Sequence, residues 1–225
     1  MIELKKAVPW GRSLEEYVQM FALTPEDCQR RILDCAGGPA SFNAQMTIKG
    51  YNVVACDPLY HFTAAEIAQR IQETYPIIIQ GVQETRDQFV WTSITSPAQL
   101  GEIRMAAMNQ FIADFPLGLA ARRYVTDALP SLSFDTKQFD LALCSHFLFS
   151  YSDLGEDFHQ ASILELCRTA KEVRIFPLLM NFSNQTSPWL QPTIKYLQSQ
   201  GYQTEIMQVA YEFQKGGNQL LRIYT

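Results

Sequence analysis

One stretch near the start of the chain constrains the fold more than any other. Residues 31–35 are a short apolar run, residues 36–39 a glycine turn, residues 41–49 a helical pattern, and residues 51–56 a second apolar run. Apolar runs of this length, buried on both faces, are typical of strands in a parallel sheet. The stretch therefore predicts a strand, turn, helix and strand joined by a right-handed crossover.

The rest of the chain continues this alternation. A helix is expected where Ile163, Leu166 and Cys167 recur at helical spacing, and another at 188–200. Further strands are expected at 123–125, within 139–149, and at 173–180, 205–214 and 219–224. The last two flank a Gly-Gly pair, which favours a hairpin. We therefore expect an α/β fold with a doubly wound, mainly parallel seven-stranded sheet, helices on both faces and a C-terminal antiparallel hairpin.

Two segments are expected to be mostly helical. Residues 1–30 form an N-terminal helical cap, with a capping box beginning at Ser13. Residues 61–119 form a helical insertion, in which Ile77–Ile79 is the one expected strand and Ser96 begins a long helix. We interpret the apolar stripe of that helix as core, with a lid over the site as the alternative.

Length and composition limit the class of protein. Domains average about 150 residues, so the chain of 225 is predicted to be a single domain, 1–225. A net charge of −5 disfavours nucleic acid as a partner, because proteins that bind nucleic acid gather positive charge on one face.

Five widely spaced cysteines predict no metal site and a reducing compartment. With no signal peptide and no membrane-spanning run, we expect a cytoplasmic protein without a membrane partner; its oligomeric state is left open.

Acidic residues and glycines follow the first three predicted strands. Asp34 with Gly37 and Gly38 comes at the first strand, Asp57 after the second and Asp127 after the third. In an open α/β sheet the ligand lies at the carboxyl ends of the strands. Glycines allow close backbone approach, and an acid at the end of the second strand accepts both hydroxyls of a ribose. These residues therefore predict a nucleoside site.

The glycine turn does not fit a dinucleotide. The pyrophosphate fingerprint is G-x-G-x-x-G, whereas residues 36–41 read Ala-Gly-Gly-Pro-Ala-Ser. A nicotinamide-dependent oxidoreductase is for this reason the least favoured of the functions considered.

At these residues the chain resembles class I S-adenosylmethionine-dependent methyltransferases. Their first motif is apolar-apolar-Asp-x-Gly-x-Gly-x-Gly, and residues 32–40 follow it with two glycines replaced by alanine. The likeness continues through residues 53–57, 125–128 and 139–145, and ends in the family's terminal hairpin. It covers residues 31 to 225 except the helical insertion, and the segment 144–151 is similar to that of uncharacterised bacterial members. The resemblance implies a Rossmann-like methyltransferase fold and S-adenosyl-L-methionine as cofactor.

The resemblance also implies roles for individual residues. The loop of Ala36, Gly37 and Gly38 would pack on the methionine part of the cofactor, and Asp34 would orient its amino group. The implied cofactor site is completed by Asp57 and Pro58 at the ribose, Asp127 and Ala128 at the adenine, and Ser145 at the end of the fourth strand. Each acid also has an alternative role that is purely structural. Asp57 could begin a turn, Asp127 could cap a loop, and Asp34 could be a buried, hydrogen-bonded acid.

The candidate catalytic residue is His146, which follows the fourth predicted strand. An unperturbed pKa near 6.5 suits a general base at neutral pH, and the alternative is a histidine that walls the cofactor site. Tyr151, Asp153 and Arg12 are weaker candidates for an acceptor pocket. Their alternatives are a surface turn, a helix cap and a solvated charge.

The function expected from these residues is methyl transfer from S-adenosylmethionine to a small molecule. A protein side chain is a less favoured acceptor, and nucleic acid the least favoured. The alternative from a different class is a non-catalytic domain that binds S-adenosylmethionine or a nucleoside.

Overall fold

The computed structural model describes residues 8–225 and contains a seven-stranded mixed sheet. Its strands are β1 (Ile32–Cys35), β2 (Val53–Cys56), β3 (Tyr124–Val125), β4 (Leu141–Ser145), β5 (Glu172–Phe176), β6 (Gln203–Gln208) and β7 (Gln219–Tyr224). Their order is β3-β2-β1-β4-β5-β7-β6, and β7 runs antiparallel to both β5 and β6 while the other pairs are parallel. The predicted fold class is confirmed.

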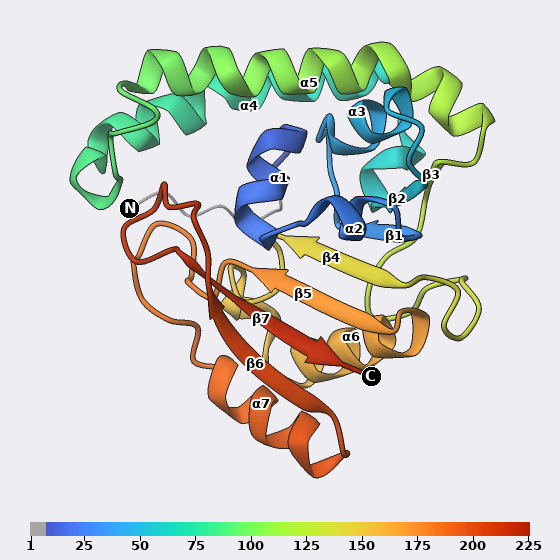
Figure 1. The fold of residues 1–225 in the computed structure, drawn as a ribbon. Coiled ribbons are helices and arrows are strands. Elements are labelled where there is room, and N and C mark those ends of the chain that lie inside the picture. Colours follow the sequence, from blue (N-terminus) through green and yellow to red (C-terminus); the bar gives the residue numbers. More distant parts are fainter. Residues whose placement is uncertain (1–7) are drawn as a thin grey trace.

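Helices cover both faces of this sheet (Figure 1). One face carries α1 (Leu14–Phe21), α2 (Pro25–Cys28) and α3 (Phe42–Ile48), and the other carries α6 (Glu156–Thr169) and α7 (Leu190–Ser199). Alternate residues of a strand point to opposite faces, so Ile32 packs under α1 and α3 whereas Leu33 packs under α6 and α7. The seven residues that begin the predicted N-terminal cap lie outside the described part of the chain.

The segment between β2 and β3 consists of two long helices lying side by side, α4 (Ala64–Glu84) and α5 (Pro97–Ala120) (Figure 1). Ser96 caps α5 as predicted. The strand predicted at Ile77–Ile79 is wrong, because these residues belong to α4. The apolar positions Ile67, Ile71 and Ile78 recur there at helical spacing and are buried, while Ile77 is 55% exposed. No helix within residues 8–225 is both long and apolar enough to cross a membrane.

Two predicted strand boundaries are also wrong. β5 ends at Phe176 because Pro177, which follows, has no amide hydrogen to continue the ladder. β6 ends at Gln208, so β6 and β7 are joined by a loop of residues 209–218 and not by a tight glycine turn. Part of this loop pairs instead with the α4–α5 connection, since the Val90 amide donates to the Phe213 carbonyl.

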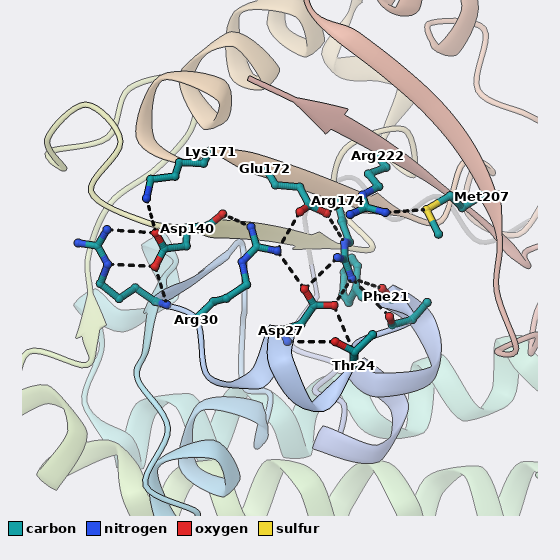
Figure 2. A network of polar contacts seen from close by, with 12 residues as sticks. Phe21, Thr24, Asp27, Arg30, Asp140, Lys171, Glu172, Arg174, Met207 and Arg222 are labelled. Carbon is teal, nitrogen blue, oxygen red and sulfur yellow. Dashed lines mark hydrogen bonds and ion pairs between the residues drawn. The ribbon is translucent and has the colours of Figure 1, made fainter.

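A buried ionic network fastens the corner between α1 and α2 to the sheet (Figure 2). Arg174 of β5 donates to the Asp27 carboxylate at 3.0 and 3.1 Å, to the Phe21 carbonyl at 2.8 Å and to Glu172 at 2.8 Å. Burial alone raises the pKa of Asp27, but the Thr24 amide and Arg174 outweigh it and hold that pKa below its usual value. The network thus positions α1, which contributes side chains to the site described below.

Candidate functional site

A cavity of about 460 Å³ lies at the carboxyl ends of β1, β2 and β4. The strand order places β1 next to β4, where the connections reverse direction and where open α/β sheets bind ligands. The predicted site residues that line this cavity are Ala36, Gly37, Gly38, Asp57, Pro58, Asp127, Ala128, Ser145 and His146. Asp34 is the exception. The structure therefore brings all but one of the predicted residues around one space.

The loop after β1 follows a tight path. Ala36 and Gly38 have φ angles of 56° and 53°, in the left-handed region that favours glycine. A side chain at Gly37 would place its Cβ 2.6 Å from Oδ2 of Asp34, so only glycine fits there. The backbone amides of Ala36 and Gly37 donate to the Cys56 carbonyl at 2.8 and 3.4 Å. The loop is thereby fixed against the end of β2.

Asp34 lies within β1 and not at its end, directly beneath Gly37. Its side chain is buried, and the Tyr17 hydroxyl donates to Oδ1 at 3.0 Å. Burial raises the pKa of Asp34 to about 8; the Tyr17 hydrogen bond opposes this shift. At neutral pH the carboxyl group is therefore mostly protonated, until a cation comes close.

Asp57 follows β2 and caps a short 3-10 helix, η1 (Pro58–His61). Its Oδ2 accepts from the Gly38 amide at 3.0 Å and its Oδ1 from the Leu59 amide at 2.7 Å. Burial raises the pKa of this carboxylate, and the two amides act against that shift. Each oxygen keeps a second lone pair for a further hydrogen bond toward the cavity.

Asp127 follows β3, whose pairing with β2 brings it to the same edge of the sheet. Its Oδ2 accepts from the amide and hydroxyl of Ser133 at 2.8 and 2.7 Å. Its Oδ1 has no hydrogen-bond partner among residues 8–225, so it remains an available acceptor beside the cavity. Ala128, the next residue, is exposed and also lines the cavity.

Ser145 and His146 stand at the end of β4. The Ser145 hydroxyl lies 2.9 Å from Nδ1 of His146, and the His146 amide donates to the Phe176 carbonyl at 2.6 Å. Burial lowers the pKa of His146 well below 6.5, and the charges of Arg12 and Arg104 lower it further. The ring is therefore neutral at physiological pH. The serine hydroxyl serves either tautomer, because it can donate to Nδ1 or accept from it.

A buried triad joins three elements, and two of its members, Arg104 and Tyr211, line the cavity. None of the three was predicted from the sequence as a site residue. Arg104 of α5 lies 2.6 Å from the Glu16 carboxylate of α1, and the Tyr211 hydroxyl donates to Glu16 at 3.2 Å. Arg104 also donates to the Tyr211 oxygen at 3.3 Å. One feature of the sequence could have indicated Arg104. It is a charged residue within the apolar stripe of the predicted helix, four residues after Leu100 and three before Ala107.

The three weaker candidates for an acceptor pocket differ in whether they line the cavity. Arg12 and Tyr151 line the cavity, whereas Asp153 is exposed and does not line it. Arg12 donates from Nη1 to the Trp10 carbonyl at 3.2 Å. Its Nε is buried without a partner, and within residues 8–225 no carboxylate forms an ion pair with it. The interpretation of Arg12 as a solvated charge is therefore wrong.

Three segments that are distant in sequence form a roof over the far side of the cavity. Phe89 of the α4–α5 connection stacks on Phe213 of the β6–β7 loop, with ring centroids 4.8 Å apart. Gln214 of the same loop donates to the Met180 carbonyl at 3.0 Å. Met180 lies after β5, so that segment is the third part of the roof. We call the space beneath the roof the aromatic compartment; it is lined by Trp10, Phe89, Phe182 and Phe213.

The fold is that of a doubly wound α/β protein with a cavity at the switch point of its sheet. The chain is 32% identical over 224 residues to the uncharacterised protein MJ0045 of Methanocaldococcus jannaschii. The alignment covers 99% of this chain and 98% of that protein. The chain belongs to the same family as MJ0045. No protein-family model matches the chain. Because this relative is archaeal, the likeness to bacterial members stays a prediction.

Solved structures with a similar fold include several methyltransferases. A TehB-like S-adenosylmethionine-dependent methyltransferase from Corynebacterium glutamicum aligns over 93% of this chain and 86% of its own, with a TM-score of 0.49 and 14% identity. The magnesium protoporphyrin IX methyltransferase of Synechocystis, solved with bound S-adenosylmethionine, aligns over 94% and 77%, with a TM-score of 0.47 and 13% identity. Similarity at this level does not assign a function, which has to be inferred from the residues of the site.

Proposed function

We propose that the protein is an S-adenosyl-L-methionine-dependent methyltransferase that acts on a small-molecule acceptor. The supporting observation is the arrangement along one edge of the sheet. The glycine loop with Asp34 beneath it, then Asp57 and then Asp127 follow one another from β1 to β2 to β3. His146 stands on the other side of the loop, at the end of β4. This is the order that a nucleoside joined to an amino acid requires.

The residues present fit this cofactor. Asp57 offers carboxylate lone pairs to the two ribose hydroxyls, and the free Oδ1 of Asp127 offers an acceptor to the adenine amine. The left-handed loop at Ala36 and Gly38 leaves room for the methionine part. Asp34, close under this loop, becomes ionised when an ammonium group approaches it, because a nearby cation favours the charged form.

When bound, S-adenosylmethionine supplies a methyl group on a cationic sulfur. The protein contributes by aligning donor and acceptor, which is the main requirement of a direct displacement. The aromatic compartment excludes water from the side beyond β4. The neutral His146 ring offers one nitrogen that can accept a proton from an acceptor hydroxyl or amine.

Two other functions are less well supported. A domain that only binds S-adenosylmethionine or a nucleoside would not need space beyond the end of β4, yet the cavity continues past His146 into the aromatic compartment. An oxidoreductase that uses NAD or NADP would need the G-x-G-x-x-G turn, which residues 36–41 do not have.

A thermal-shift comparison tests the proposal. A ligand at 100 times its dissociation constant stabilises the folded state by about 2.7 kcal/mol, which corresponds to a rise of about 5–10 °C in Tm for a chain of this size. S-adenosylmethionine and S-adenosylhomocysteine should each produce this rise, and NAD should not. A rise with NAD alone, or with none of the three, would refute the proposal. A labelled-methyl screen of cell extract then separates an enzyme from a binding domain.

A further inference from the structure

The lining of the cavity is divided by charge. Its acidic members, Asp57 and Asp127, lie at the ends of β2 and β3. Its basic members are Arg12, Arg70 and Arg104. No carboxylate among residues 8–225 lines the aromatic compartment. The acids therefore lie in the part of the cavity assigned to the cofactor, together with Arg70, whose guanidinium lies over the Phe62 ring after η1. The aromatic compartment is apolar, with Arg12 beside Trp10.

Among residues 8–225, the positive charge of Arg12 and Arg104 is only partly neutralised. Glu16 compensates the charge of Arg104 through the ion pair at 2.6 Å. Arg12 lies beside this pair, and within residues 8–225 the one hydrogen bond of its side chain is to the Trp10 carbonyl. With a buried Nε left without a partner, its guanidinium still has donors to offer. A partly buried charge with a buried, unpartnered donor is stabilised when an anion pairs with it.

The guanidinium of Arg12 lies next to the aromatic compartment, because its Nη1 donates to the carbonyl of Trp10 at 3.2 Å and both residues line the cavity. Its charge lowers the pKa of His146 and acts to lower that of Tyr151, both of which lie at or beyond the end of β4. Trp10, two positions before Arg12 in the chain, lines the aromatic compartment.

We infer that the methyl acceptor is an organic acid with an apolar, ring-sized body, whose carboxylate pairs with Arg12 and whose body fills the space between Trp10, Phe89 and Phe213. This inference rests on the proposed function, because it assigns to the acceptor the part of the cavity that the cofactor leaves free. Arginine suits the task, since its planar fork matches the two oxygens of a carboxylate. Stacked aromatic rings provide the apolar surface for the body of the acceptor.

Matched compound sets test the inference on the full chain saturated with S-adenosylhomocysteine. Each set holds one ring system as carboxylate, primary amide and amine: indole-3-acetate with indole-3-acetamide and tryptamine, and 2-naphthoate with its amide and 2-naphthylmethylamine. We expect at least one carboxylate to raise Tm and to bind at least tenfold more tightly than its amide or amine, as measured by calorimetry. Arg12→Gln should weaken this carboxylate at least tenfold, and Arg12→Lys should recover part of the loss.

A charge-matched control and the cofactor product complete the test. Lys195→Gln removes an exposed positive charge on α7 and should leave the carboxylate affinity unchanged. The inference is overturned if amines or amides bind as well as acids, if no acid in the panel binds, or if Arg12→Gln leaves the acid affinity intact. It is also overturned if Arg12→Gln weakens S-adenosylhomocysteine but not 5′-methylthioadenosine, since Arg12 would then hold the cofactor's own carboxylate. Failure of S-adenosylhomocysteine to bind the wild-type protein refutes the proposed function instead. The binding of the acids is then measured in the absence of S-adenosylhomocysteine.

Discussion

The backbone amide of Gly38 lies 3.0 Å from Oδ2 of Asp57, so one hydrogen bond joins the loop after β1 to the end of β2. The other oxygen of the same carboxylate accepts from the Leu59 amide at 2.7 Å. Asp57 thus fixes two backbone segments that border the cavity while both oxygens keep lone pairs for a ligand. A site held in place before binding loses less free energy to ordering.

Replacement of Asp57 by Ala removes an acceptor for two amides and, in the proposed function, the ribose contact. We expect the affinity for S-adenosylhomocysteine to fall at least tenfold and the free energy of unfolding to fall by about 1–3 kcal/mol. Calorimetry measures the first and chemical denaturation the second. Asp153→Asn, which changes an exposed acid outside the cavity, should alter neither. An unchanged affinity in Asp57→Ala would show that this acid does not contact the ligand.

Asp34 makes the stability of the unliganded protein depend on pH. Its folded-state pKa of about 8 exceeds the value of about 3.9 in an unfolded chain, so the folded state binds more protons between these limits. The free energy of unfolding therefore falls as pH rises from about 4 to about 8, by up to about 1.4 kcal/mol per pH unit. Asp34→Asn should flatten this slope while still accepting the Tyr17 hydrogen bond. Denaturation at pH 5 and pH 8 checks this, and equal slopes in the two proteins would contradict it.

Ala36 occupies a left-handed position where most residues are strained. Ala36→Gly should raise the free energy of unfolding by about 0.5–1 kcal/mol, because relief of the strain exceeds the extra entropy that glycine gives to the unfolded chain. The gain should appear as a Tm higher by about 1–4 °C. A lower Tm would mean that the methyl group makes packing contacts that outweigh the strain.

His146 is predicted to accept a proton during methyl transfer. His146→Ala should lower kcat by about 100-fold or more and leave the affinity for S-adenosylhomocysteine within a factor of three. Since the pKa of His146 lies well below 6.5, kcat of the wild-type protein should not decline between pH 7.5 and pH 6.5 through protonation of this ring. An unchanged kcat in the variant would assign His146 to the wall of the site.

The network at Asp27 should make the fold sensitive to acid. The pKa values of Asp27 and Glu172 are both held low, chiefly by hydrogen bonds that outweigh their burial. Their contribution to stability is therefore complete above about pH 4.5 and is lost as pH falls through the folded-state values. Asp27→Asn should cost about 3 kcal/mol at pH 7, because it leaves Arg174 short of a buried partner, and less at pH 3. A cost that does not change with pH would show that the charge of Asp27 is not responsible.

The sheet and most of the cofactor side of the site could be predicted because both depend on short-range patterns. Buried runs such as residues 51–56 mark strands, and an acid at a strand end reaches the same edge as its neighbours by geometry alone. Asp34 was predicted at a strand end but lies one residue earlier, where the strand is buried on both faces. The side chain is a buried, hydrogen-bonded acid, which was the alternative stated for it, and burial raises its pKa to about 8.

The acceptor side could not be predicted because it depends on contacts between distant segments. Arg104 meets Glu16 across 88 positions of the chain, and Phe89 meets Phe213 across more than half of it. The β6–β7 loop contains the Gly-Gly pair of a tight hairpin, yet its pairing with residues 89 and 90 overrides that local preference. The sequence carries no periodic signal for such contacts.

The position of the β6–β7 loop sets an order of events during synthesis. The cofactor side of the cavity is built from segments that end with β4, whereas the roof needs Phe213 and Gln214, near the end of the chain. β7, which lies between β5 and β6 in the sheet, follows this loop in the chain. A ribosome-bound chain that has emerged only through β5 would expose the nucleoside residues without an enclosed place for an acceptor. In the proposed function, an acceptor could then be enclosed only after β7 has been synthesised.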